Sequence, residues 1–135
     1  MTKTYLNSLT YKIIGACIEV HRELGAGLLE SVYHKCLKHE LSKQGLSFQS
    51  ELKVQIFYKD STIETELRCD FLVENCIVIE LKAVEVINPI HEAQLLTYMK
   101  LLKVPKGILI NFNCVNLFKS GQKTFVNDIF TNLPD

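Results

Sequence analysis

The sequence lacks a long apolar run, since no segment approaches the roughly 20 residues that span a bilayer. Its first residues also lack the continuous apolar stretch of a signal peptide. There is no internal repeat, low-complexity segment or linker. These absences predict a cytoplasmic protein with no membrane partner.

Closely spaced cysteine pairs are absent as well. The five cysteines are odd in number, lie in apolar patterns and form no C-x-x-C pair. We therefore expect reduced core cysteines, and the pattern does not favour a structural zinc site.

Charge of one sign is not in excess, because fifteen basic residues balance fifteen acidic ones. Overall charge therefore gives no support for strong non-specific binding of nucleic acid, which would need a local patch. Lysines make the last third of the chain locally basic: Lys100, Lys103, Lys106, Lys119 and Lys123.

The length of 135 residues and the hydrophobic share of 47% predict one folded domain over residues 1–135. Helical and alternating periodicities indicate the elements. In chain order we expect helices over residues 5–23 and 28–43, strands over 52–58, 63–73 and 77–82, a helix over 89–102, a strand over 108–112 and an edge strand over 115–118. The tail is expected to form a short helix or a packing arm. This order predicts an α/β fold with a mixed sheet and helices packed against it.

Residues 68–82 hold two β-rich runs separated by a turn, and Glu80 and Lys82 share one face of the second run. Directly paired residues of an antiparallel hairpin lie on the same face, so the register decides whether Asp70 meets Glu80. A two-residue turn would send the two acids to opposite faces. A connection of odd length centred on Asn75 would place them opposite each other. Asn tolerates the left-handed conformation that three-residue hairpins need, so we predict the odd connection.

Adjacent Asp70 and Glu80 carboxylates would suit Mg²⁺ or Mn²⁺, and the main-chain carbonyl of Leu81 can complete the protein's share of ligands. Lys82 can stabilise phosphoryl charge or orient a water. Together these are parts for metal-assisted hydrolysis of a phosphodiester. The alternative is that Glu80 and Lys82 form an exposed pair that contributes little and is common on strands. Their position at the end of an apolar run favours the site.

A further acid, Glu30, heads an otherwise apolar stripe formed by Tyr33, Leu37 and Leu41. A buried carboxylate is costly unless a cation or hydrogen-bond donors compensate it. The alternative is that Glu30 is exposed at the start of its helix, where the helix dipole favours an acid. Both interpretations stay open at this stage.

The run from Gly27 to Tyr33 matches G-x-x-E-x-x-Y, the signature of a group of small bacterial and archaeal proteins named after it. That group is placed in the PD-(D/E)XK nuclease-like superfamily. Three further runs resemble motifs of the RecB-like branch, in the same order: the acidic residue at Cys69-Asp70, the E-x-K motif at Glu80-Leu81-Lys82 and the Q-x-x-x-Y motif from Gln94 to Tyr98. The resemblance covers about residues 11–118, and four motifs in order are far more specific than one.

The resemblance implies a restriction-endonuclease-like core of three layers, with a central mixed four-stranded sheet flanked by helices. It makes Asp70, Glu80 and the Leu81 carbonyl the ligands of Mg²⁺ or Mn²⁺. Cys69 stands where the superfamily's name has Pro, at a position that varies widely.

The remaining roles also follow from the resemblance. Lys82 would be the catalytic lysine, and Glu30 an additional acid that contacts the metal directly or through water. Gln94 and Tyr98 would position the lysine or the DNA backbone. His91 has no assured counterpart, and we expect a satisfied surface histidine.

The resemblance therefore implies a metal-dependent nuclease that hydrolyses DNA, in repair, recombination or defence against mobile elements. RNA is a second substrate class within the superfamily, and a small phosphorylated substrate would instead need a closed pocket. The intact motif set favours the enzyme. Neutral charge and the lack of an obvious DNA-binding appendage favour the alternative, a non-catalytic module that binds a protein partner or forms a homodimer. Small nuclease domains of this sort often act as dimers or with a partner that supplies specificity.

Overall fold

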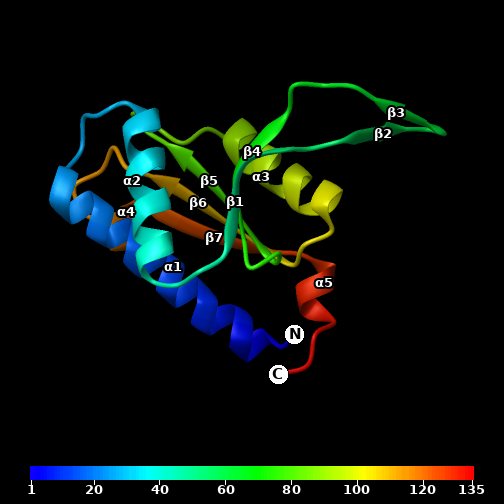
Figure 1. Ribbon diagram of the computed structural model, residues 1–135, viewed down its shortest axis with the longest axis horizontal. Helices are drawn as coiled ribbons and strands as arrows, with labels where there is room; N and C mark the ends of the chain where they lie inside the picture. The colour runs from blue at the N-terminus through cyan, green and yellow to red at the C-terminus, as the bar shows by residue number, and fades with distance from the viewer.

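A computed structural model describes residues 1–135, and at its centre is a five-stranded mixed sheet (Figure 1). Its strands, in spatial order, are β1 (Phe48–Lys53), β4 (Arg68–Val73), β5 (Ile77–Lys82), β6 (Lys106–Asn111) and β7 (Gln122–Val126). β5 and β6 are parallel, and the other neighbouring pairs are antiparallel. The expectation of four strands was wrong, because β7 adds a fifth strand at the edge beyond β6.

Helices cover both faces of the sheet, which gives the three layers (Figure 1). α1 (Lys3–Leu24) and α2 (Glu30–Lys43) pack on one face, and α3 (Pro89–Leu102) packs on the other. All three were predicted to within two residues at each end. None of the helices combines the length and the apolar composition needed to cross a bilayer.

The start of α3 confirms the structural interpretation of His91. The Asn88 side chain accepts a hydrogen bond from the first-turn backbone, and the Nδ1 atom of His91 accepts one from the Asn88 N–H at 3.1 Å. Pro89 occupies the first helical position, where its missing N–H costs nothing. His91 is therefore satisfied as part of a capping box.

The strand expected over residues 52–58 is in fact two strands in different sheets. β1 ends at Lys53, and β2 (Ile56–Tyr58) pairs with β3 (Ser61–Ile63) to form a separate two-stranded sheet. This pair, which we call the arm, projects from the body of the molecule (Figure 1). The next expected strand likewise divides into β3 and β4. Alternating periodicity continues across both breaks, so it does not reveal that the chain changes partner.

The edge strand expected over residues 115–118 was also wrong. The chain there enters the one-turn helix α4 (Leu117–Ser120), because the Asn116 side chain accepts the Lys119 N–H at 3.0 Å. Gly121 then passes close to the end of β6, where an added Cβ would lie 2.8 Å from the Asn111 carbonyl oxygen. This tight turn leads into β7. A second one-turn helix, α5 (Asp128–Thr131), confirms the short helix expected in the tail.

Alternation along the central strands divides the core between the two faces of the sheet. The larger cluster lies between the sheet and α1 and α2, and its central-strand members include Phe71, Ile79, Leu81, Ile108 and Ile110. The smaller cluster lies under α3 and includes Cys69, Leu72, Val78, Leu95, Met99 and Leu109. β4 and β5 are therefore buried on both faces of the sheet, so side chains at the ends of these two strands are held on a rigid support.

The G-x-x-E-x-x-Y run organises the connection between α1 and α2. Tyr33 stacks on Phe112 with ring centroids 4.4 Å apart. Its hydroxyl donates to the Gly25 carbonyl at 2.6 Å and accepts the Leu28 N–H at 3.2 Å. Gly27 has φ of 96°, a conformation that favours glycine. The glycine and the tyrosine of the motif thus hold the loop whose end starts α2.

We expect Tyr33→Phe to lower the free energy of unfolding by about 1–2 kcal/mol, because it removes both loop hydrogen bonds and keeps the aromatic stack. Urea unfolding followed by circular dichroism measures the change. Tyr11→Phe is the control, since Tyr11 is 82% exposed and surface changes usually stay within about 0.5 kcal/mol. Equal losses in the two variants would contradict a structural role for the Tyr33 hydroxyl.

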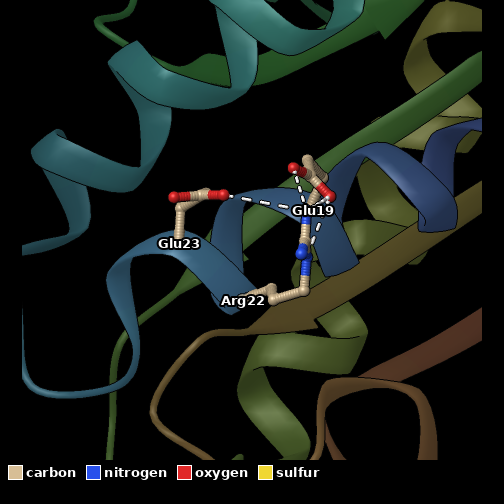
Figure 2. Close-up of polar contacts among 3 residues, drawn as sticks. All are labelled: Glu19, Arg22 and Glu23. Atoms are coloured by element: carbon tan, nitrogen blue, oxygen red, sulfur yellow. Dashed lines mark hydrogen bonds and ion pairs between the residues drawn. The ribbon is translucent and has the colours of Figure 1, made fainter.

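The solvent face of α1 carries a small charge cluster near the end of the helix (Figure 2). An Nη2 atom of Arg22 lies 2.6 Å from Glu19 Oε1 and 3.7 Å from Glu23 Oε1. The hydrogen bond that Arg22 donates to Glu19 raises the pKa of the guanidinium. Such exposed pairs contribute little to stability. The cluster is therefore ordinary surface and forms no part of the site below.

Candidate functional site

The hairpin between β4 and β5 has the register that the sequence predicted. The strands are joined by three residues centred on Asn75, which has φ of 57°. Phe71 and Ile79 form the last pair of the ladder, so Asp70 and Glu80 are the next residues beyond it on the two strands. The prediction of an odd-length connection is confirmed.

Asp70 and Glu80 each bind the main chain of the opposite strand. The Asp70 N–H donates to Glu80 Oε2 at 2.8 Å, and the Leu81 N–H donates to Asp70 Oδ2 at 2.7 Å. The Lys82 carbonyl accepts from the Phe112 N–H, on the β6 side. Because successive backbone groups point to alternate sides of a strand, the Leu81 carbonyl faces β4, where Asp70 lies. Two carboxylates and one carbonyl therefore converge where β4 and β5 part.

The two acids lie toward different layers of the fold. Glu80 follows Val78 on the α3 side and is only 5% exposed. Asp70 opens toward α2, and its side chain is 25% exposed. The alternation of β4 is interrupted here, since Cys69 belongs to the core under α3 and Phe71 to the core under α1 and α2. The interruption turns Asp70 into the gap between the strands.

An exposed ion pair between Glu80 and Lys82 is excluded by this geometry. Glu80 is buried, and the Lys82 ammonium forms none of the hydrogen bonds or ion pairs within 4.0 Å. Burial, and then the nearby Asp70 carboxylate, raise the pKa of Glu80 to about 9. Without a metal ion, Glu80 therefore keeps its proton at neutral pH, because a second negative charge beside Asp70 is unfavourable there.

These residues fit a hard divalent cation. No group of three or more His, Cys, Asp or Glu side chains has the arrangement of a metal site. Mg²⁺, however, commonly takes only one or two carboxylates from a protein and completes its shell with waters and substrate phosphates. Asp70, Glu80 and the Leu81 carbonyl supply that share. Such an ion would displace the proton of Glu80 and neutralise the charge of the two carboxylates.

In EDTA, we expect the stability of the wild type to fall as pH rises, because the folded protein keeps on Glu80 a proton that the unfolded chain loses. The pKa of Glu80 rises from its usual 4.5 to about 9 on folding, so its contribution is complete below the lower value and is lost toward the higher one. Urea midpoints across that range measure the slope. Glu80→Gln should flatten it, and Glu66→Gln, at an exposed position, should not. An unchanged slope in Glu80→Gln would contradict the raised pKa.

A cleft of about 350 Å³ opens beside Asp70 on the α2 side. It is lined entirely by polar residues: Glu30, Ser31, His34, Lys35, Glu51 and Asp70. Glu30 is exposed in the first turn of α2, as the dipole interpretation expects. It also faces the site, since burial and the Asp70 carboxylate raise the pKa of Glu30 while Lys82 lowers it. The structure thus brings Glu30 into the same cleft as Asp70.

His34 is a neighbour of the site that sequence analysis missed. Its Nδ1 atom lies 3.9 Å from Asp70 Oδ1, and its ring stacks on Phe71 with centroids 4.4 Å apart. Its Nε2 atom is buried without a hydrogen-bond partner. The one available signal was the spacing of four residues from Glu30, which places both on one face of α2. Spacing along a helix does not reveal a contact with a strand.

Gln94 and Tyr98 approach the site from α3. The Gln94 Nε2 donates to the Tyr98 hydroxyl oxygen at 3.2 Å. Burial, and then the nearby Glu80 carboxylate, raise the pKa of Tyr98. The two residues of the Q-x-x-x-Y run therefore meet each other on the layer toward which Glu80 points.

A sequence model of the PD-(D/E)XK nuclease superfamily matches residues 7–125. The chain belongs to the PD-(D/E)XK nuclease superfamily. The matched region includes every site residue described above. None of the curated proteins and none of the solved structures matches the chain. Membership of the PD-(D/E)XK superfamily indicates a nuclease, and with it nucleic acid as ligand and the divalent metals that these nucleases generally use.

Proposed function

We propose that this PD-(D/E)XK protein hydrolyses phosphodiester bonds of DNA with Mg²⁺ or Mn²⁺ held by Asp70, Glu80 and the Leu81 carbonyl. The observation that carries the proposal is the reciprocal exchange of hydrogen bonds between the two acids and the opposite strands, at 2.8 and 2.7 Å. It fixes both carboxylates before any ligand arrives, and preorganised groups are what catalysis needs. RNA is the second substrate class.

In this proposal, some residues of the site bind the metal ion or a water, and Lys82 stabilises the charge of the phosphoryl group. A bound divalent ion polarises the phosphate and makes a bound water more acidic. Lys82, whose ammonium has no partner in the chain, stabilises the negative charge that develops on the phosphoryl group. Glu30, open in the cleft beside Asp70, orients a water or contacts the ion through one.

Gln94 and Tyr98 are proposed to position Lys82 or the nucleic-acid backbone. Their mutual hydrogen bond and the proximity of Tyr98 to Glu80 support this role. These two residues also support assignment to the RecB-like branch, and the loop held by Tyr33 supports assignment to the G-x-x-E-x-x-Y group. Repair, recombination or defence against mobile elements are the processes that such a nuclease would serve.

A cleavage assay tests the proposed function. Linear, nicked and single-stranded DNA, and RNA of the same sequence, are incubated with the wild type in Mg²⁺, in Mn²⁺ and in EDTA. We expect cleavage of at least one DNA form that requires the metal and stops in EDTA. A folded protein that binds Mn²⁺ and cleaves none of these substrates would contradict the proposal.

The second candidate is a non-catalytic module that binds a protein partner or forms a homodimer. The observation that favours it is an apolar groove of about 440 Å³ along α1, where Tyr11, Ile14, Gly15, Ile18 and Phe118 lie. The zero net charge agrees with such a role. Sedimentation velocity over a range of protein concentrations would show self-association, and the absence of Mn²⁺ binding would then favour this candidate.

A further inference from the structure

The arm formed by β2 and β3 has no core of its own. Phe57 is 66% exposed and Tyr58 is 62% exposed, and Ile63 is also exposed. A single two-stranded hairpin is marginally stable in water, and large aromatic side chains usually gain from burial. The arm nevertheless projects from the body as a regular ribbon with defined pairing, Ile56 to Ile63 and Tyr58 to Ser61 (Figure 1). Its apolar tip is therefore available to a ligand.

The root of the arm is fixed to the body. Val54 is buried in the core under α3, and its N–H donates to the Leu67 carbonyl at 2.9 Å, which closes the root. Lys53 and Glu64 form an ion pair of 3.1 Å across the same place. The direction in which the arm leaves the sheet is thus set by the core and does not depend on the tip.

The root also adjoins the candidate metal centre. β4 begins at Arg68, two residues before Asp70, so the arm leaves the sheet at the end where the two acids lie. Tyr58 lies five residues beyond Lys53, a reach of about 17 Å at roughly 3.3 Å per residue. That is the length of about five stacked nucleotides at 3.4 Å each. A strand bound at the metal centre could therefore extend along the arm.

Electrostatic attraction does not explain what the arm binds. Over the arm and its root, residues 53–68, three basic residues are balanced by three acidic ones: Lys53, Lys59 and Arg68 against Asp60, Glu64 and Glu66. Glu64 and Glu66 already pair with Lys53 and Arg68. What the arm offers is two adjacent aromatic rings, which point to opposite faces of the ribbon. Aromatic rings bind unpaired bases by stacking, without need of net charge.

We propose that the arm binds unpaired bases of the nucleic-acid substrate by stacking on Phe57 and Tyr58, next to the Asp70 and Glu80 centre. The inference rests on the proposed function for the nature of the ligand. The Lys59 ammonium lies 5.5 Å from the centre of the Tyr58 ring and leaves its other face to a base. Duplex DNA, whose bases are already stacked, is the poorer ligand of the arm.

The first test uses the absence of tryptophan from the chain. Phe57→Trp places the protein's single tryptophan on the arm, and a base stacked on it quenches the tryptophan emission. The probe is a single strand of twenty thymidines in EDTA, which prevents cleavage. We expect strong quenching in this variant, weaker quenching by the matched duplex, and none in Val115→Trp, which lies at a 99% exposed position outside the arm. Equal responses of the two variants would overturn the proposal.

The second test measures the affinity of arm variants for the oligonucleotide and the mass of the protein in solution. Phe57→Ala and Tyr58→Ala should each weaken binding of the same oligonucleotide about ten-fold without changing its salt dependence, since no phosphate contact is lost. Val115→Ala should bind as the wild type does. Without oligonucleotide, the tryptophan emission of Phe57→Trp should not depend on protein concentration. If it does, and sedimentation shows a doubled mass, the arm binds a second copy of the chain and the proposal is overturned.

The two proposals fail in different ways. Mn²⁺ binding and cleavage by the wild type, with arm variants that bind and cleave equally well, would overturn the arm and leave the nuclease standing. A wild type that binds no Mn²⁺ but whose Phe57→Trp variant is quenched by the oligonucleotide would contradict the nuclease and support the arm.

Discussion

Replacing Lys82 with alanine is expected to lower the cleavage rate by roughly 100-fold or more, the scale on which one preorganised stabilising group acts. The side chain lies beyond Glu80 on the same strand, and its ammonium has no partner in the folded chain. No hydrogen bond or ion pair of the folded state therefore depends on its charge. Mn²⁺ affinity and the midpoint of thermal unfolding should stay close to those of the wild type.

Lys100→Ala is the matched control, because Lys100 is an exposed lysine of α3 outside the site. It should cleave at the wild-type rate. A Lys82→Ala protein that loses several degrees of thermal stability along with its activity would contradict the catalytic role and indicate a structural one. Single-turnover cleavage at saturating Mn²⁺ separates the chemical step from metal binding.

Asp70→Asn is expected to abolish both Mn²⁺ binding and cleavage. The amide oxygen of asparagine can still accept the Leu81 N–H, so the hairpin is kept while the charge is lost. Removing that charge also relieves the repulsion that helps to raise the pKa of Glu80. The metal-free variant should therefore be at least as stable as the wild type at neutral pH, which separates lost function from lost folding.

Calorimetry of Mn²⁺ binding and thermal unfolding in EDTA measure the two effects of Asp70→Asn. Asp60→Asn is the control, since Asp60 is exposed in the turn of the arm and forms no ion pair. It should bind Mn²⁺ as the wild type does. Undiminished binding by Asp70→Asn would remove Asp70 from the site, whatever happened to cleavage.

Local patterns predicted the elements that depend on local physics. The three long helices follow from apolar periodicity and from the Asn88 and Pro89 start signal. The hairpin register follows from the tolerance of Asn75 for positive φ. The arm was not predicted, because β1 and β2 share one alternating pattern although they belong to different sheets. Periodicity reports which side is buried, and it does not report which strand is the partner.

In the candidate site, too, the features that depend on local sequence were predicted and the contacts between distant segments were not. The meeting of Asp70, Glu80 and Leu81 was predicted, since it depends on register within one hairpin. The contact between His34 and Asp70 was not, because it joins two layers of the fold. The basic stretch near the C-terminus was also an incomplete guide to the surface. Lys106 is 6% exposed and donates to Asn7 at 3.0 Å, so burial removes it from any nucleic-acid patch.

Titration of Mn²⁺ into the metal-free wild type and Glu80→Gln by calorimetry tests the metal centre most directly. Glu80→Gln is the more informative variant for this comparison, because a buried glutamine can replace a protonated Glu80 with little change in shape. We expect the wild type to bind the ion and the folded variant to bind none. A folded wild type that does not bind Mn²⁺, or a Glu80→Gln protein that binds it equally well, would contradict the site at the parting of β4 and β5.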